Sequence, residues 1–390
     1  MRRWLLPESI EDLLPDEARQ VENLRRRLLD ECLTQGYELV VPPLVEYIES
    51  LLTGSGRDMD LRTFKLVDQL SGRTMGLRAD ITPQVARIDS HLLNRNGVVR
   101  LCYCGPVVHA LPSGFNATRE PIQLGAELYG HAGIEADVEL VTLLLRALDV
   151  AQVALARIDF GHVGIFRALA DRLESPQLRS EDGLQDLFAA LQAKDMPSLR
   201  QLLVDERATL KAAFLALPDL YGKADTLARA RAALPDFPEI ATALAELERV
   251  GATVDADALG FDLADLRGYH YHSGITFAAY CAGQAQAIAL GGRYDEVGKS
   301  FGRARPATGF SLDLRQLARQ TPQLERRSGI RAPYVHDAAL MQRVRALRDA
   351  GEIVVADLPG HPDDVAELGC DRQLEFVEGE WQIVSLDRKV

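Results

Sequence analysis

Residues 105–130 of the chain read GPVVHALPSGFNATREPIQLGAELYG, and the last third of this stretch alternates between two kinds of residue. Gln123, Gly125 and Glu127 occupy every second position, with apolar residues between them. In a β-strand this alternation places the apolar side chains on the core face and the amide and carboxylate on the other face. A glycine between two polar residues allows a close approach to the backbone. The stretch predicts a strand with a ligand-holding face, although a solvated sheet face has the same pattern.

The bulk composition is that of a globular protein. The chain has 390 residues, 47% of them hydrophobic and 26% charged, which is enough for one large domain and a small one. No apolar run is long enough to cross a bilayer, and residues 1–20 contain acidic residues and prolines in place of a long apolar core. We therefore expect a cytoplasmic protein without a membrane partner. The net charge of −13 disfavours a broad grip on nucleic acid, while a local basic patch stays open.

The five cysteines are few, odd in number and scattered, which is typical of a reducing compartment. Cys102 and Cys104 have one residue between them, closer than the cysteines of a zinc knuckle. They lie in the strand-like sequence VVRLCYCG. We interpret them as small core residues and expect no metal.

Several segments near the amino terminus have the patterns of particular elements. Residues 16–35 carry a helical apolar stripe, and a glycine follows as a C-terminal stop. Pro42 and Pro43 interrupt a strand, which indicates an edge or an interface because neither proline can donate to a sheet ladder. Thr82 and Pro83 have the pattern of an N-cap and a first helical residue.

Hairpins mixed with helices follow, which is an α+β pattern. We predict strands around residues 98–110 and 119–129, and a helix near 135–149. From about 165 to 250 the chain is rich in Leu and Ala and has almost no β-branched runs. This composition indicates an inserted helical subdomain.

The carboxyl-terminal third returns to β-patterning. Gly291 and Gly292 of the sequence GGRYDE predict a tight hairpin turn. Residues 321–332 are polar and charged, and we expect them to link a core of residues 1–320 to a small α/β domain of residues 333–390. That domain reads as a helix, the strand EIVVADL, a second helix and a hairpin across EGEW.

Four polar residues are candidates for one binding site. Asp80 and Thr82 lie two positions apart at a predicted strand-to-helix junction, and we expect them across the sheet from Gln123 and Glu127. Two carboxylates and an amide on one concave face suit a cationic ligand such as an amino group or an imidazolium.

A second polar cluster, LRGYHYHSG, contains Arg267, His270 and His272. In a strand the two histidines share one face, as some metal sites require, but no third ligand is evident. We favour hydrogen-bonded surface or pocket histidines. The nearby Arg293 and Tyr294 of GGRYDE lack the sequence context of a phosphate-binding loop.

Taken in order, these motifs resemble the catalytic core of histidyl-tRNA synthetases. The similar segments are LLPESIEDLLPDEA, TFKLVDQLSGRTMGLRADITPQVAR, GPVVHALPSGFNATREPIQLGAELYG, LRGYHYHSGITF, GGRYDEVGKSFG and RPATGFSLDL. The resemblance covers about residues 1–320, with the helical stretch in the place of that family's inserted domain. It implies a class II aminoacyl-tRNA synthetase fold, an antiparallel sheet flanked by helices, with a helical insertion and then the small α/β module.

The chain departs from the synthetases at the positions that grip ATP in that family. The resemblance places an arginine and a glutamate where this sequence has His109 and Leu111, and an arginine where it has Gln316. Leucine cannot accept a hydrogen bond, and a neutral imidazole replaces a guanidinium poorly on phosphate. Arg315 stands one position too early, so we expect it to point elsewhere. Both contacts to ATP are predicted to be lost.

The tail after the core is shorter than the anticodon-binding domain of a synthetase. A synthetase-like core with altered ATP positions and a short tail resembles the regulatory subunits of ATP phosphoribosyltransferase. That family implies a protein with no catalytic residues and no cofactor, which activates a short-form catalytic subunit in the first step of histidine biosynthesis. It further implies a hetero-oligomer, a hetero-octamer, built on synthetase-like self-dimers, with no tRNA partner. We expect the Pro-interrupted VVPPLVEY segment near the two-fold axis.

The resemblance also implies a pocket that binds histidine. The residues that match histidine-holding or site-lining positions are Asp80, Thr82, Gln123, Glu127, Arg267, Tyr271 and Tyr294. Two positions depart from the pattern, since His109 replaces an arginine and His272 replaces a tyrosine. A vestigial pocket that is retained only as part of the core is the alternative.

Two other functions stay open from the sequence. One is an amino-acid-activating ligase whose ATP site is rebuilt from Arg119, Arg267 and Arg293. The other is a tRNA-binding sensor. The leucine at position 111 argues against the ligase.

Overall fold

The structure is a computed structural model that describes residues 4–53, 57–112, 117–266, 271–360 and 368–386. The chain divides into two compact units, Met1–Pro322 and Gln323–Val390. Each unit has a hydrophobic core of its own. No helix in the described part of the chain is both long enough and apolar enough to cross a membrane.

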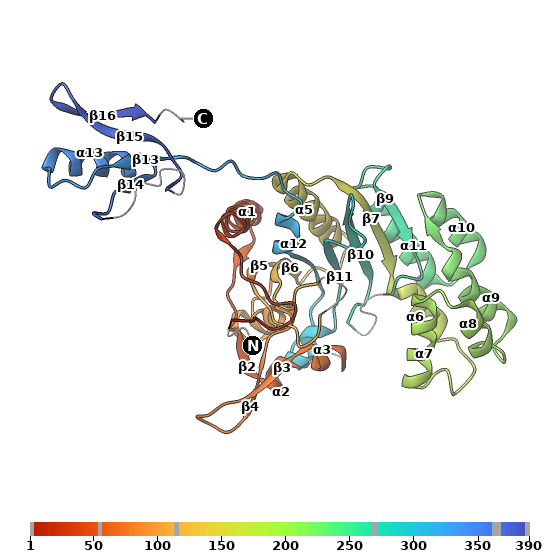
Figure 1. Ribbon diagram of the computed structural model, residues 1–390. Coiled ribbons are helices and arrows are strands. Elements are labelled where there is room, and N and C mark those ends of the chain that lie inside the picture. The colour runs from red at the N-terminus through yellow and green to blue at the C-terminus, as the bar shows by residue number, and fades with distance from the viewer. Residues whose placement is uncertain (1–3, 54–56, 113–116, 267–270, 361–367, 387–390) are drawn as a thin grey trace. The chain divides into compact units, whose positions relative to one another are not determined.

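A large mixed sheet forms the centre of the first unit (Figure 1). In spatial order its described strands are β1 (Glu38–Leu39), β5 (Val99–Pro106), β6 (Ile122–Tyr129), β12 (Ala307–Asp313), β11 (Ala289–Arg293), β10 (Ile275–Cys281), β7 (Leu155–His162), β9 (Leu259–Asp262) and β8 (Tyr221–Gly222). The pairings are antiparallel except for β1 with β5 and β7 with β9. This arrangement confirms the predicted α+β class with a largely antiparallel sheet between helices.

Three helices in the described part of the chain cover one face of the sheet. They are α1 (Pro15–Thr34), α5 (Glu135–Ala151) and the short α12 (Leu314–Ala318). The predicted stripe on α1 is confirmed, because Val21, Leu24 and Leu28 are buried in the main core with α5 and β6. Gly36 follows α1 with φ +84°, the left-handed conformation that ends many helices. Cys102 is also buried in this core, with Cys104 packed against it, as predicted.

The opposite face of β6 is buried too, so the interpretation of that face as solvated is wrong. The elements that cover it are α4 (Thr82–Arg87), a π-helical turn η1 (Ile88–Leu93) and a 3-10 turn η3 (Val297–Phe301). They share a second core with Tyr103, Tyr129 and Tyr294. The predicted N-cap at Thr82 is also wrong. Thr82 is already helical and the N-cap position is Ile81, while the backbone N–H of Thr82 donates to Asp80 Oδ1 at 3.0 Å.

The predicted interruption by Pro42 and Pro43 is confirmed. β1 is the edge strand of the large sheet and ends before the prolines. After them the chain forms a separate antiparallel sheet, in the order β2 (Val45–Tyr47), β4 (Thr74–Leu77), β3 (Phe64–Val67). The short helices α2 (Ile48–Leu51) and α3 (Arg57–Arg62) lie between β2 and β3 in the sequence.

The helices predicted over residues 165–250 are present beside the β7 and β9 side of the sheet (Figure 1). They are α6 (Val163–Ala170), α7 (Glu181–Gln192), α8 (Met196–Leu202), α9 (Ala208–Ala216) with the 3-10 turn η2 (Leu217–Asp219), α10 (Asp225–Ala233) and α11 (Pro238–Gly251). Their leucines and alanines join the main core, and α11 packs on β7 and α6. The insertion is therefore anchored to the sheet through apolar contacts.

The predicted hairpin turn at GGRYDE is wrong. Gly291 and Gly292 lie inside β11, paired with β10 on one side and β12 on the other. A Cβ atom at Gly291 would lie 2.3 Å from Cζ of Phe277, so the glycine makes room for an aromatic ring of the neighbouring strand. Arg293 then ties β11 to α5, because its guanidinium hydrogen-bonds the buried carboxylate of Asp137.

The second unit contains a four-stranded sheet among its described residues. Its elements are β13 (Gly329–Ala332), α13 (Ala338–Asp349), β14 (Val354–Ala356), β15 (Cys370–Val377) and β16 (Glu380–Ser385), with the strand order β14-β13-β15-β16. The predicted helix, strand and hairpin across EGEW are present. Residues 329–332, predicted as linker, form β13 instead. The second helix predicted for this unit falls where residues 361–367 lie outside the described residues.

The Arg293–Asp137 pair generates a stability prediction. Arg293→Met leaves a buried carboxylate without its cation, which costs about 3–5 kcal/mol of unfolding free energy. Arg95→Met removes the exposed Arg95–Glu38 pair and serves as the control, with an expected change within about 1 kcal/mol. Urea unfolding followed by circular dichroism measures both. Equal losses in the two variants would contradict the structural role of Arg293.

Candidate ligand-binding site

Glu127 lies at the centre of the candidate site, on the face of β6 that α4 and η3 cover. It is 1% exposed, and its carboxylate accepts hydrogen bonds from two phenols. The hydroxyl of Tyr103 donates to Oε1 at 3.0 Å, and the hydroxyl of Tyr294 donates to Oε2. Burial raises the pKa of Glu127 to about 8, and the bonds from Tyr294 and Tyr103 oppose this rise.

Two glycines, one on β12 and one on β6, make this arrangement possible. Gly309 of β12 lies opposite Glu127, and a Cβ atom there would overlap Oε2 of the carboxylate. Gly125 of β6 lies opposite Tyr103, and a Cβ atom there would lie 2.4 Å from the Tyr103 hydroxyl. The close approach to the backbone that was predicted at Gly125 is therefore made by the side chain of Tyr103.

Asp80, Thr82 and Gln123 form a second hydrogen-bonded group, connected to Glu127 through Tyr103. The Gln123 amide donates to Asp80 Oδ1 at 2.7 Å and accepts from the backbone N–H of Ile81 at 2.8 Å. The Thr82 hydroxyl lies 2.9 Å from the hydroxyl of Tyr103. The structure thus brings together the four residues that the sequence placed at one site.

Aromatic rings line the same region. The rings of Tyr271 and Tyr294 are 5.0 Å apart between centroids, and Tyr294 also meets Tyr129 edge to face. The hydroxyl of Tyr271 is buried and has no hydrogen-bond partner among the described residues. A buried hydroxyl without a partner is costly unless a ligand or water satisfies it. Tyr271 therefore has an unused donor beside the acidic group.

The second predicted cluster is only partly described. Arg267 and His270 lie outside the described residues. His272 precedes β10, so the prediction that it lies in a strand is wrong. Burial lowers the pKa of His272 to about 4, and its Nδ1 lies 3.3 Å from the carbonyl oxygen of Arg293. Within the described residues no group of three or more His, Cys, Asp or Glu side chains has the placement of a metal site.

His109 stands where the resemblance to synthetases places a phosphate-binding arginine. The ring is buried, with Nε2 3.0 Å from the carbonyl oxygen of Ala79 and the Arg62 guanidinium near both ring nitrogens. A neutral ring satisfies both partners, because Nε2–H donates to the carbonyl while Nδ1 accepts from Arg62. Burial, followed by the charge of Arg62, lowers the pKa of His109 to about 4. The imidazole of His109 is therefore neutral near neutral pH, and the cation beside it is Arg62.

The other positions that would contact ATP in a synthetase also differ here. Leu111 is 63% exposed and apolar. Arg315 is buried and donates to the backbone of Glu120 and to the carboxylate of Glu11, so it points elsewhere as predicted. Arg119 donates to the carbonyl oxygens of His109 and Glu8.

Two residues that position the site were missed from the sequence, Tyr103 and Gly309. Tyr103 is embedded in an apolar strand, and nothing in its local sequence indicates a polar role. What marks these two residues is their cross-strand pairing: Tyr103 lies opposite Gly125, and Gly309 lies opposite Glu127. This pairing depends on strand register, which the local sequence does not give.

The site chemistry is that of recognition. Two carboxylates, one amide and several hydroxyls converge on a region lined by aromatic rings. Such a set binds an ammonium or imidazolium group through charge-assisted hydrogen bonds.

Two family models match the chain. Residues 9–317 match the family model for histidyl-tRNA synthetase. Residues 327–384 match the model described as ATP phosphoribosyltransferase subunit HisZ C-terminal domain. Together the two matches span most of both units.

Curated relatives match over nearly the whole chain. An ATP phosphoribosyltransferase regulatory subunit from Cupriavidus necator is 59% identical, with 98% of each chain covered. One from Ralstonia nicotianae is 58% identical, again with 98% of each chain covered.

Solved structures agree on the fold. A protein from Bacillus halodurans, titled as an ATP phosphoribosyltransferase regulatory subunit/histidyl-tRNA synthetase, superposes with a TM-score of 0.82 at 27% identity, covering 94% of this chain and 96% of that one. The histidyl-tRNA synthetase from Nostoc sp. PCC 7120 has a TM-score of 0.75 at 17% identity over 98% of this chain and 97% of its own, which shows the shared fold alone. With a synthetase-like core, the matched C-terminal domain and relatives of this identity, the chain belongs to the family of ATP phosphoribosyltransferase regulatory subunits.

Proposed function

We propose that this chain is a non-catalytic subunit that activates the short-form catalytic subunit of ATP phosphoribosyltransferase in the first step of histidine biosynthesis. It acts in the cytoplasm and needs no cofactor of its own. The family supports the partner and the pathway. The observation that carries the non-catalytic part is the state of His109, a buried neutral ring held by Ala79 and Arg62.

An activating ligase needs cations that reach the phosphates of ATP. Of the three arginines considered for a rebuilt site, Arg267 lies outside the described residues. Arg293 is held by Asp137 and Asp295, and Arg119 is held by backbone carbonyls and stacks over the ring of Phe64. Moving either one toward a nucleotide would break several of these bonds. The described residues therefore support a regulatory role over a ligase.

The assembly we propose is a self-dimer that joins catalytic subunits in a hetero-octamer. The edge of the large sheet supports the self-dimer, since β1 is short and the apolar residues Leu39, Val41 and Leu44 near it are exposed. Pro42 and Pro43 interrupt the ladder there. Exposed apolar residues beside an edge strand are typical of a protein interface.

We further propose that the site around Glu127 binds histidine, with the α-amino group between Glu127 and Asp80. The buried hydroxyl of Tyr271, which has no hydrogen-bond partner among the described residues, supports a ligand at this place. The connected hydrogen bonds of Gln123, Thr82 and Tyr103 support a preformed site, because each group is already held in position.

The test of activation mixes the purified chain with the short-form catalytic subunit encoded in the same genome. We expect the two to co-elute in size-exclusion chromatography and the rate of phosphoribosyl transfer to rise when the chain is added. The mechanism is a shift in the population of active assemblies. The catalytic subunit alone is the control. If the proteins neither co-elute nor show a higher rate, the proposed function is wrong.

Another prediction concerns amino-acid activation. The chain is expected to show no histidine-dependent ATP–pyrophosphate exchange, because each lost charge contact to ATP costs about 3 kcal/mol in the transition state. A histidyl-tRNA synthetase in the same assay supplies the reference rate. Exchange at a comparable rate would show that the ATP site has been rebuilt.

The third prediction concerns the pH dependence of histidine binding. With the pKa of Glu127 near 8 in the free protein, its carboxyl group is mostly protonated at pH 7, and an ammonium ligand must displace that proton. Affinity for histidine should therefore rise by about fivefold as the pH increases from 7 to 8, and the rise should level off above the pKa of Glu127. Calorimetry measures this, with Glu127→Gln as the control, which should bind weakly without the pH trend. Equal affinity in the variant would exclude Glu127 from the binding site.

A further inference from the structure

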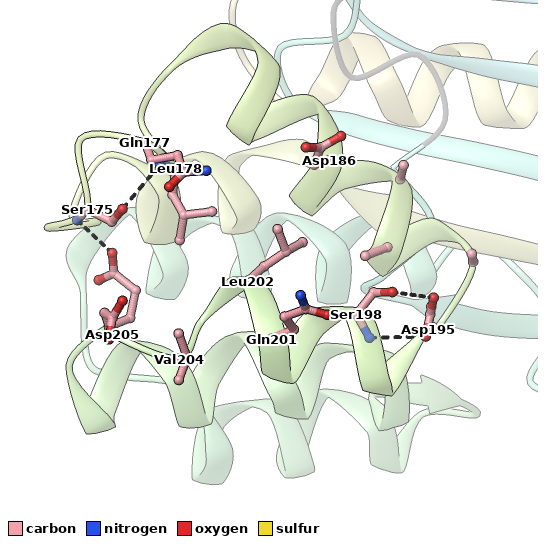
Figure 2. A pocket seen from close by; sticks show the side chains of 14 residues that line it. Ser175, Gln177, Leu178, Asp186, Asp195, Ser198, Gln201, Leu202, Val204 and Asp205 are labelled. Atoms are coloured by element: carbon pink, nitrogen blue, oxygen red, sulfur yellow. Dashed lines mark hydrogen bonds between the residues drawn. The ribbon is translucent and has the colours of Figure 1, made fainter.

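The helical insertion contains an open groove of about 570 Å³, far in the sequence from the Glu127 site (Figure 2). One wall is α7, which contributes Asp186 and Ala189, together with Ala193 directly after the helix. The other wall is α8 with its flanking turns, which contribute Leu202 and Val204 among others. All of the residues that line the groove belong to the described part of the chain.

The floor of the groove is apolar, and part of it consists of small side chains. Ala189 of α7 and Ala193, the residue that follows the helix, are exposed alanines four positions apart, and Val204 is 63% exposed. Small side chains at this spacing let the backbone of another helix approach closely, while Leu202 and Val204 provide apolar area for it to cover. The open groove has the size of a binding cleft, and its apolar floor is exposed.

The rim of the groove is acidic without a compensating cation. It carries Asp186, Asp195, Asp205 and Glu206, and none of the lining residues is Lys or Arg. Two nearby cations are engaged elsewhere, since Lys194 pairs with Asp262 and Arg207 with Glu174. A third, Lys211, donates to the carbonyl oxygen of Val204 at 3.3 Å and forms no ion pair with the rim carboxylates among the described residues.

The four carboxylates have two different roles. Glu206 is buried and accepts from the backbone N–H groups of Glu174 and Ser175, which fixes the loop at one end of the groove. Asp195 caps α8 by accepting from the Ser198 N–H at 3.2 Å and the Ser198 hydroxyl at 2.6 Å. Asp186 and Asp205 are exposed, and their carboxylates make no hydrogen bond or ion pair with another described residue. They lie on opposite sides of the groove (Figure 2).

We propose that this groove docks a basic amphipathic helix of the catalytic subunit, with Lys or Arg side chains that pair with Asp186 and Asp205. The proposal rests on the proposed function. The occupant has a few small or apolar side chains that face Ala189 and Ala193, flanked by cations that neutralise the two free carboxylates. Charge complementarity selects a cationic partner and disfavours nucleic acid, since phosphates are repelled by the rim.

A second copy of this chain is a poorer occupant than another protein. The chain has 57 acidic and 44 basic residues, so two copies repel each other on average. The regulatory subunit family places a catalytic subunit beside this chain, and that subunit is the partner to which we assign the groove.

The test compares two pairs of charge reversals within the same insertion. The groove variant is Asp186→Lys with Asp205→Lys. The matched control is Asp182→Lys with Asp236→Lys, two exposed carboxylates that do not line the groove and have no hydrogen bond or ion pair with another described residue. A third variant, Ala193→Phe, fills the floor without a change in charge. Circular dichroism and thermal melting establish that each variant is folded.

Affinity for the short-form catalytic subunit is then measured by calorimetry, and self-association by light scattering. We expect the groove variant to bind at least about tenfold more weakly than the control, with a smaller dependence on salt. Ala193→Phe should also bind more weakly, and self-association should not change in any variant.

Three results would overturn the proposal. If wild type binds and activates but the groove variants match the control, the groove is not the docking site, and the proposed function stands. If the groove variants change self-association alone, a second copy is the occupant. If wild type neither binds nor activates the catalytic subunit, the proposed function fails and this inference fails with it.

Discussion

The carboxylate of Glu127 is buried in the centre of a sheet, and it must be hydrogen-bonded there. A buried carboxylate without partners costs several kcal/mol, so the surrounding strands must supply donors and space. Tyr103 of β5 and Tyr294, which follows β11, supply the donors, and Gly309 of β12 supplies the space. The register of three strand pairs is thereby tied to one side chain. A shift of one residue in any of them would place a Cβ atom or an apolar group against the carboxylate.

Four buried arginines of the core are also held by hydrogen bonds and ion pairs within the chain. Arg305 is buried, and its Nη1 donates to both carboxylate oxygens of Asp89 in the π-helical turn. Arg78 is buried and donates to the carbonyl oxygens of Pro42 and Pro106. Arg293 and Arg315 join helices and the amino-terminal segment to the sheet. Guanidinium groups committed to such bonds are not free to bind phosphates, which fits a synthetase-like scaffold used for regulation.

Local patterns predicted most of the elements because their causes are local. The stripe on α1, the Leu and Ala run of the insertion, the proline break after β1 and the EGEW hairpin each reflect a periodicity or a turn residue within a few positions. The failures share a different cause. Thr82 was assigned as the N-cap although it is the first helical residue and Ile81 precedes it, and Gly291 and Gly292 were assigned to a turn although they lie in β11. In both cases a neighbouring strand or loop decides the role of the residue.

The sequence by itself determined the fold class, the helical insertion and the four polar residues of the candidate site, because alternation, composition and motif order are properties of the chain alone. Only the tertiary structure decided that Tyr103 fills the space beside Gly125, that the buried hydroxyl of Tyr271 has no partner among the described residues and that His109 is neutral. It also decided that Asp186 and Asp205 face one groove. These properties depend on burial and on contacts between segments far apart in the sequence. Burial sets the protonation of His109 and Glu127, and strand register sets which side chain meets which glycine.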